Sequence, residues 1–221
     1  VDGGDGTDTL KVESSSDASA ISIATDVQIA GIEVIDASSL TAGVSINLSR
    51  QTEGFTVKSG PGSDAITGGN GNDSIIGGAG DDGIIGGAGD DTIVGGSGDD
   101  TIVGSAGSDS IAGGSGDDVV VGFTAGDTVD GGAGNNTLKL VTLEDVRAFN
   151  NAADSQIVNI QVLDLSSATQ DAKNELNLRN QTETFNFIGF TTGGTGGTGG
   201  TSGGTTGGTG GTGGTSGGGT S

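Results

Sequence analysis

The chain of 221 residues contains no Cys, His, Met, Trp or Tyr. Without Cys it can form neither a disulfide framework nor a zinc–thiolate site. Without His it lacks the commonest general base and the commonest ligand for transition metals. The metals that remain are hard cations, which bind through carboxylate and carbonyl oxygens.

Basic residues are also scarce, with 7 Lys plus Arg against 29 Asp plus Glu and a formal net charge of −22. Binding to nucleic acid or to an anionic membrane needs positive charge that neutralises phosphates, so the sequence disfavours both partners. There is no apolar stretch long enough to cross a bilayer and no basic-then-apolar N-terminus, so we expect neither a membrane span nor a signal peptide. Export by a route without an N-terminal signal stays open.

Catalysis is not expected, and the sequence predicts that the chain is not an enzyme. Its many Ser residues have no His to activate them. Pairs of acids like those of glycosidases would lack the Trp and Tyr platforms that usually hold sugars.

What the chain does have is glycine, 49 residues of it, and a repeat. A nine-residue unit, Gly-Gly-x-Gly-x-Asp-x-(Ile/Val)-x, recurs over residues 59–139. Such self-similarity at a fixed period is typical of stacked repeat architectures. The units start at Ser59, Gly68, Gly77, Gly86, Gly95, Gly104, Gly113, Gly122 and Gly131.

Eight of the nine units carry a carboxylate at position six, and all nine carry an aliphatic residue at position eight. Glycine accepts the positive φ angles that let backbone carbonyls of a loop turn toward one centre. The three residues after the Asp would form a short strand with its middle side chain inward. If two units make one coil, carboxylate and carbonyl oxygens ring each gap between stacked loops, which suits several Ca²⁺ ions better than the smaller Mg²⁺. The predicted ligands are Asp64, Asp73, Asp82, Asp91, Asp100, Asp109, Asp118 and Asp127, with Asn136 in the last unit.

The array should fold only with its metal. Residues 59–138 hold thirteen Asp and no Lys or Arg. Carboxylates stacked about 5 Å apart repel by roughly 1 kcal/mol per pair in water. We therefore expect a disordered metal-free array and a folded calcium-bound one. At position five, Asp81, Asp90, Asp99 and Asp117 are interpreted as solubilising charge. The loops are too acidic to cradle phosphate, and no Lys follows them.

The sequence divides into four segments: a β-rich cassette at residues 1–58, the array at 59–139, a second copy of the cassette at 129–190 that overlaps the end of the array, and a Gly/Thr/Ser tail at 191–221. Residues 32–39 match residues 160–167 at the same offset that relates Val1 to Val129. Short apolar clusters between Ser, Gly and Asp predict strands in both cassettes. A helix is predicted at 143–153 with Thr142 as N-cap. The corresponding region of the first cassette, 14–24, is rich in Ser.

The tail, residues 191–221, repeats Gly-Gly-Thr triplets without charge. It is either a flexible linker or an extended helix of the polyglycine type with three residues per turn. The isolated unit at residues 3–8 opens the chain where an array would end. We interpret the chain as a piece of a longer polymer of alternating arrays and cassettes.

With six near-perfect consecutive units, the array resembles the RTX (hemolysin-type calcium-binding) repeats. The resemblance implies an all-β fold: a right-handed parallel β-roll, or β-helix, with two nonapeptides per turn and calcium between turns. It also implies type I secretion. The cassettes resemble the segments that separate RTX blocks in bacterial surface-layer proteins and large adhesins. Departures from the unit at the array ends put metal binding by the units at 122 and 131 in doubt.

Three functions fit these features. The first is a structural calcium-binding module of a secreted bacterial surface protein, in which calcium supports a surface-layer-like lattice. The second is the stalk or spacer of a large RTX adhesin, and the third is the secretion and folding module of a type I-secreted hydrolase. The expected location is extracellular, at the bacterial cell surface. Besides calcium, candidate partners are copies of the chain, neighbouring modules of a longer chain and cell-surface polysaccharide.

Overall fold

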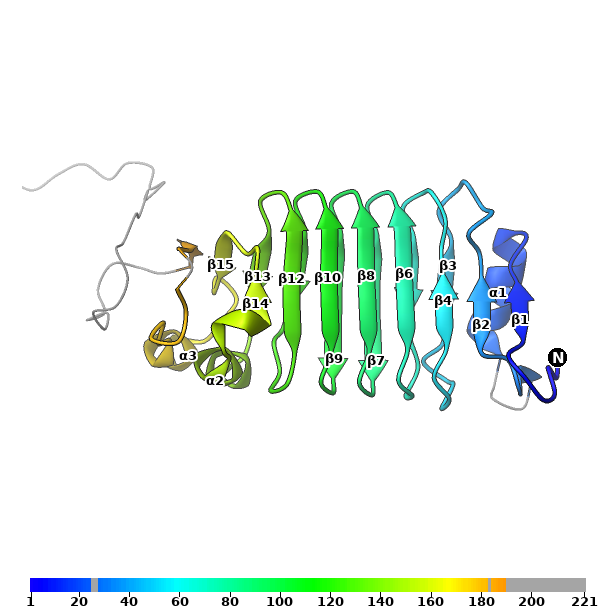
Figure 1. Ribbon diagram of the computed structural model, residues 1–221, viewed down its shortest axis with the longest axis horizontal. Coiled ribbons are helices and arrows are strands. Elements are labelled where there is room, and N and C mark those ends of the chain that lie inside the picture. The colour runs from blue at the N-terminus through cyan, green and yellow to red at the C-terminus, as the bar shows by residue number, and fades with distance from the viewer. Residues whose placement is uncertain (25–27, 183, 190–221) are drawn as a thin grey trace, which may run out of the picture.

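The computed structural model describes residues 1–24, 28–182 and 184–189. The predicted tail at 191–221 lies outside the described residues, so its two conformations stay predictions. The described chain is an elongated solenoid in which two parallel sheets face each other along the long axis (Figure 1). The predicted β-solenoid is thereby confirmed.

The first sheet contains eight strands, and each neighbouring pair is parallel. Its strands in spatial order are β1 Thr9–Lys11, β2 Val34–Asp36, β4 Thr56–Lys58, β6 Ser74–Ala79, β8 Thr92–Ser97, β10 Ser110–Ser115, β12 Thr128–Ala133 and β14 Ile157–Val158.

The second sheet also contains eight parallel strands. They are β3 Ser45–Asn47, β5 Ala65–Thr67, β7 Gly83–Ala88, β9 Thr101–Ala106, β11 Val119–Val121, β13 Thr137–Lys139, β15 Val162–Asp164 and β16 Asn186–Ile188. Consecutive array strands alternate between the two sheets, so each turn of the solenoid uses two nonapeptides.

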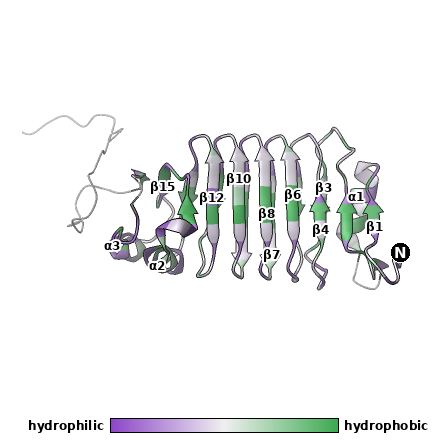
Figure 2. Cartoon of the chain, in the orientation of Figure 1, coloured by the Kyte–Doolittle hydropathy of each residue, from purple (hydrophilic) through white to green (hydrophobic). Residues whose placement is uncertain are grey.

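The aliphatic residue at position eight builds the core. Ile75 pairs with Ile93 in the first sheet and Ile84 with Ile102 in the second, and all four are at most 1 % exposed. The apolar bands therefore line up at mid-strand along the roll (Figure 2). Each fully buried aliphatic contributes about 1.5–3 kcal/mol to the stability of the fold.

Tight turns between strands require glycine at defined positions. Gly96, at position two, has φ +127°, and a Cβ there would lie 2.0 Å from the carbonyl oxygen of Gly78 one turn earlier. Ser105 occupies the same position in its own unit with φ 81°. This left-handed conformation is unfavourable for a residue with a side chain.

Strands of both cassettes extend the sheets of the array. The first cassette contributes β1, β2 and β4 to the first sheet, and the second contributes β13, β15 and β16 to the second sheet. Equivalent pairs recur at the sequence offset that relates the two copies: Leu10 pairs with Ile35, and Leu138 with Leu163. These equivalent strand pairs thus lie in opposite sheets. The division into four domains itself stays a prediction.

Helices lie at the two ends of the roll (Figure 1). The predicted helix at 143–153 is confirmed as α2, Leu143–Asn151, which Thr142 and Asp145 cap reciprocally. Its counterpart α1, Ser15–Ile23, starts after the N-cap Ser14. The described part of the chain also contains the 3-10 turn η2, Asp154–Gln156, and the helix α3, Gln170–Glu175. Within the described residues, no helix is long and apolar enough to span a membrane.

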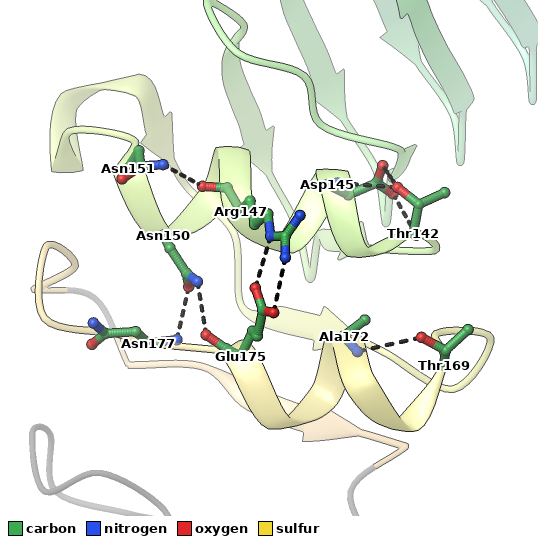
Figure 3. A network of polar contacts seen from close by, with 9 residues as sticks. All are labelled: Thr142, Asp145, Arg147, Asn150, Asn151, Thr169, Ala172, Glu175 and Asn177. Carbon is green, nitrogen blue, oxygen red and sulfur yellow. Dashed lines mark hydrogen bonds and ion pairs between the residues drawn. The ribbon is translucent and has the colours of Figure 1, made fainter.

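One side chain joins α2 to α3 and to the loop beyond it (Figure 3). Asn150 donates from Nδ2 to the Glu175 carbonyl at 2.8 Å and accepts from the Asn177 N–H at 2.7 Å. In the first cassette, the Ser22 hydroxyl accepts from the Asn47 N–H at 3.0 Å, while it donates to the Ala18 carbonyl at 2.9 Å and lies 3.5 Å from the Ser45 carbonyl. The acceptor contact is therefore common to both copies although the residue differs.

Candidate metal centres

The predicted ligands form two columns, one along each edge of the roll. Every one of them is at most 4 % exposed. One column contains Asp64, Asp82, Asp100 and Asp118 and ends at Asn136, and the other contains Asp73, Asp91, Asp109 and Asp127. The structure thus places all eight aspartates at equivalent points of the turns, between a glycine loop and the strand that follows.

One carboxylate oxygen of each aspartate ties two turns together. The main-chain N–H of Asp73 donates to Asp91 Oδ1 at 2.8 Å, and the N–H of Asp91 donates to Asp109 Oδ1 at 2.9 Å. The same bond recurs from turn to turn along both columns. Oδ1 is therefore a structural acceptor.

The other oxygen has no such role in the middle of the array. Five Oδ2 atoms are buried and lack a hydrogen-bond partner within the described chain: those of Asp82, Asp91, Asp100, Asp109 and Asp118. A buried acceptor without a donor costs about 1–3 kcal/mol, and more when it is charged. Five such atoms at repeating positions make these aspartates candidates for coordinating a cation.

A second oxygen lies close to most of these atoms. An ideal Cβ built on Gly95 would lie 2.3 Å from Asp100 Oδ2 and 2.6 Å from the Gly113 carbonyl oxygen. The corresponding distances at Gly77 are 2.4 Å to Asp82 Oδ2 and 2.6 Å to the Gly95 carbonyl oxygen. Glycine at position one thus leaves a small cradle between a carboxylate and a carbonyl of the next turn.

The electrostatics of the cradles agree with this geometry. Burial, together with the charges of neighbouring aspartates and against the effect of a backbone N–H donor, raises the pKa of Asp91 and of Asp100 to about 6. Burial also raises the pKa of Asp73, Asp82, Asp109 and Asp118. Anionic carboxylates are therefore unfavourable here unless a proton or a cation neutralises them.

At the N-terminal end of the array, protein donors reach the same oxygen. Ser59 stands at position one in place of Gly, and its hydroxyl donates to Asp64 Oδ2. The Gly69 N–H donates to Asp73 Oδ2 at 2.6 Å. Metal binding by these two predicted ligands would have to displace a hydrogen bond.

At the C-terminal end of the array, the side chains at position six also have hydrogen-bond partners within the protein. The Thr124 N–H donates to Asp127 Oδ2 at 2.6 Å. In the last unit, the Asn136 amide donates to the carbonyl oxygens of Gly132 at 3.3 Å and Asn159 at 3.0 Å. The five central aspartates are thus the best equipped of the eight for an ion.

The aspartates at position five make a second ladder that the sequence reasoning missed. Asp81 Oδ1 accepts the N–H of Asp99, and Asp99 Oδ1 accepts the N–H of Asp117 at 2.7 Å. These side chains are exposed and cross-link turns on the outer side of the loops. The sequence signal for this ladder was the recurrence of Asp or Asn at position five of alternate units. Alternate units are one turn apart, and the position-six aspartates are linked across the same interval.

The donor set fits Ca²⁺. Calcium takes six to eight oxygen ligands in flexible geometry, and carboxylate and carbonyl oxygens are its usual ligands. Among the described residues, no group of three or more His, Cys, Asp or Glu side chains is placed to hold a metal. The cradles instead combine one carboxylate oxygen with main-chain carbonyls, so they are not acidic clusters.

Comparison with known families agrees with this geometry. The family model of the RTX calcium-binding nonapeptide repeat matches residues 59–93, 94–122 and 121–139. The chain therefore contains RTX repeats, and they coincide with the array. Neither the curated proteins nor the solved structures contain a significant match to the chain.

Proposed function

We propose that the chain is a structural calcium-binding module of a secreted bacterial surface protein, which folds when Ca²⁺ binds and supports an extracellular lattice. The observation that carries the proposal is the row of five buried Oδ2 atoms without a hydrogen-bond partner in the described chain. Those of Asp82, Asp91, Asp100 and Asp118 each share a cradle with a carbonyl of the next turn, so ions would bridge successive turns. Binding energy would then act as folding energy.

The role is structural rather than catalytic. A chain without His or Cys offers few groups that could act as a general base or nucleophile. The buried carboxylates also lie inside the stacked turns, each at most 4 % exposed, where no substrate could reach them. They can hold an ion but not process a ligand.

The outer face of the roll supports the assembly part of the proposal. Ile76 pairs with Val94 on β6 and β8, with side chains 38 % and 37 % exposed, and Ile85 on the opposite sheet is 42 % exposed. Monomeric proteins rarely keep contiguous apolar patches exposed. A neighbouring module or molecule would bury them.

A calcium titration tests the folding part. Circular dichroism should show little β signal in chelator and a large, cooperative gain in millimolar Ca²⁺, with no comparable gain in Mg²⁺. The alanine variants of Asp91 and Asp100 should shift the midpoint to higher calcium. A β-rich spectrum in chelator, or equal responses to the two metals, would contradict the proposal.

Sedimentation with electron microscopy separates the candidate roles. Ordered calcium-dependent sheets favour the lattice, and Ile76→Ser with Val94→Ser should weaken them. A monomer that only stiffens favours the stalk of an adhesin. An adjoining catalytic domain in a longer chain would favour the secretion module of a hydrolase.

A further inference from the structure

The two cassettes offer an internal comparison of one position. Asp8 in the first copy corresponds to Asn136 in the second, and Glu33 corresponds to Gln161, at the constant offset that relates the copies. The contacts are equivalent: the Asp8 N–H donates to Glu33 Oε2 at 2.8 Å, and the Asn136 N–H donates to Gln161 Oε1 at 2.7 Å. Two acids in one copy are thus two amides in the other, on the same backbone.

The second copy satisfies this position with its own atoms. Asn136 is fully buried, and its Nδ2 donates to the carbonyl oxygens of Gly132 and Asn159. A Cβ on Gly131 would lie 2.7 Å from that Nδ2 and 2.3 Å from the Asn159 carbonyl oxygen. The amide therefore occupies the cradle that the central repeats leave between a carboxylate and a carbonyl.

The first copy has the same cradle without the donor. A Cβ on Gly3 would lie 1.9 Å from the Gly31 carbonyl oxygen and 2.9 Å from Asp8 Cγ. Asp8 Oδ2 is buried and has no hydrogen-bond partner within the described residues. The Gly31 carbonyl and the Asp8 carboxyl group thus both lie next to the Cβ position of Gly3. Two acceptors without a donor are unfavourable there unless a cation binds them.

A third difference between the two copies also leaves the first copy with fewer hydrogen-bond donors. In the second copy, Asn159 Nδ2 donates to Asp130 Oδ1 at 2.7 Å. The equivalent residue in the first copy is Gly31, which has no side chain to offer to Asp2. The first copy therefore carries three acids, Asp2, Asp8 and Glu33, where the second carries one acid and three amides.

We propose that the first cassette contains a calcium site outside the nonapeptide array, formed by the carboxylate of Asp8 and the carbonyl of Gly31, with Glu33 supplying a second negative charge. In the second cassette the amide of Asn136 replaces the ion by donating to the equivalent carbonyl. One scaffold thus exists in a metal-binding and a metal-free form. The site does not depend on the proposed array sites.

Exchanging the two residues tests the assignment. The experiment counts bound Ca²⁺ by native mass spectrometry and equilibrium dialysis in the wild type, Asp8→Asn, Asn136→Asp and the double variant. Asp8→Asn should bind one ion fewer, Asn136→Asp one more, and the double variant the same number as the wild type. In hydrogen exchange, adding Ca²⁺ should slow exchange at residues 9–11 and 34–36 of the wild type. In Asp8→Asn, adding Ca²⁺ should give these residues no extra protection.

Several outcomes would overturn the proposal. Asp8→Asn could bind as many ions as the wild type, or it could fail to fold in calcium although Asn is the native residue in the second copy. Glu33→Gln is a second test, because it should weaken binding of the same ion while leaving the Asp8 carboxylate in place. Asp91→Asn changes a carboxylate of the array only, so its ion count shows separately whether the array binds Ca²⁺. If the array binds none, the difference in ion count between the wild type and Asp8→Asn still tests the site in the first cassette.

Discussion

The main-chain N–H of Asp82 donates to Asp100 Oδ1 at 2.9 Å, while Asp100 Oδ2 is buried without a hydrogen-bond partner in the described chain. A single carboxylate therefore has one oxygen for the fold and one for a ligand. Because the two roles fall on different atoms, an amide can keep the first and abolish the second. This separation makes the metal requirement accessible to single substitutions.

Asp100→Asn should reduce the dependence of folding on calcium. Its Oδ1 would still accept the Asp82 N–H, while Nδ2 could donate to a neighbouring carbonyl as Asn136 does. Loss of the charge also removes repulsion of roughly 1 kcal/mol from each neighbouring carboxylate. We expect more β signal in chelator than the wild type shows by circular dichroism, and one bound ion fewer in calcium.

Asp127→Asn is the matched control, and we expect it to destabilise the fold rather than stabilise it. The Thr124 N–H donates to Asp127 Oδ2, so an amide there would set a donor against a donor. The calcium-bound protein should lose about 1–3 kcal/mol of stability, and the variant should gain no β signal in chelator. Equal gains of β signal in chelator from the two substitutions would contradict the division into central and terminal units.

Gly95→Ala should close a cradle by steric means alone. Its Cβ would approach Asp100 Oδ2 to 2.3 Å, so the methyl group would occupy the space assigned to the ion. We expect a loss of about 1–3 kcal/mol, the typical cost of overpacking, together with a weaker calcium response.

Gly83→Ala provides the control for that substitution. The nearest atom to its Cβ would be the Asp64 carbonyl oxygen at 3.9 Å, and the backbone there is not left-handed. This variant should titrate with calcium like the wild type. A normal calcium response of Gly95→Ala in calorimetry would argue against the cradle as the binding position.

Ser105→Gly should stabilise the roll by about 1 kcal/mol, because a side chain at φ 81° carries a left-handed penalty of about 1–2 kcal/mol. The gain is limited by the larger entropy of unfolded glycine. Urea unfolding in saturating calcium measures it. Ser115→Gly, at a position without positive φ, should instead lose about 0.5–1 kcal/mol. A loss at both positions would show that Ser105 is not strained.

The sequence predicted the solenoid because its signal is periodic. The Asp at position six and the aliphatic residue at position eight each recur at a fixed period. If two units make a turn, the strand of each unit pairs with the strand of the next unit but one. The helix after Thr142 was also predictable from its cap. Its counterpart in the first cassette was hidden by serine, since its helical conformation depends on burying Ala18 and Ile21 rather than on propensity.

The differences among the eight aspartates could not be predicted from the pattern. Whether Oδ2 has a donor depends on side chains and loops elsewhere in the unit, such as the Ser59 hydroxyl or the Thr124 N–H. The equivalence of Asp8 and Asn136 follows from the constant offset between the copies, but the sequence does not show which of the two side chains has hydrogen-bond partners. Such partners depend on tertiary geometry, which composition and spacing do not encode.

Asn150→Ala should destabilise the second cassette by about 1–3 kcal/mol, because it leaves the Glu175 carbonyl and the Asn177 N–H without their partner. Asn150→Ser should recover part of the loss, since the Ser22 hydroxyl accepts the equivalent Asn47 N–H in the first cassette. Guanidinium denaturation in saturating calcium measures the effect. Arg147→Ala, which removes an exposed ion pair with Glu175, should change stability less. A reversed order would mean that the ion pair, not Asn150, holds the helices together.

Acidification should stabilise the metal-free array. Burial raises the pKa of Asp91 and Asp100 to about 6 in the folded state, against 3.8 for an ordinary Asp. Between these values the folded state binds more protons than the unfolded state, so stability falls as the pH rises. The penalty is absent below about pH 4, grows from pH 4 to 6 and is complete above pH 6. Circular dichroism in chelator from pH 4.5 to 7.5 should show this loss as a β signal that falls as the pH rises.

The same carboxylates should make calcium binding depend on pH in the opposite direction. Protons and Ca²⁺ compete for Oδ2, so the calcium midpoint should rise as the pH falls below about 6. The double variant Asp91→Asn with Asp100→Asn should flatten the pH dependence in chelator, because its amides do not titrate. A general effect of the net charge of −22 would instead persist in that variant. An unchanged slope would therefore assign the pH dependence to the whole surface and not to the buried columns.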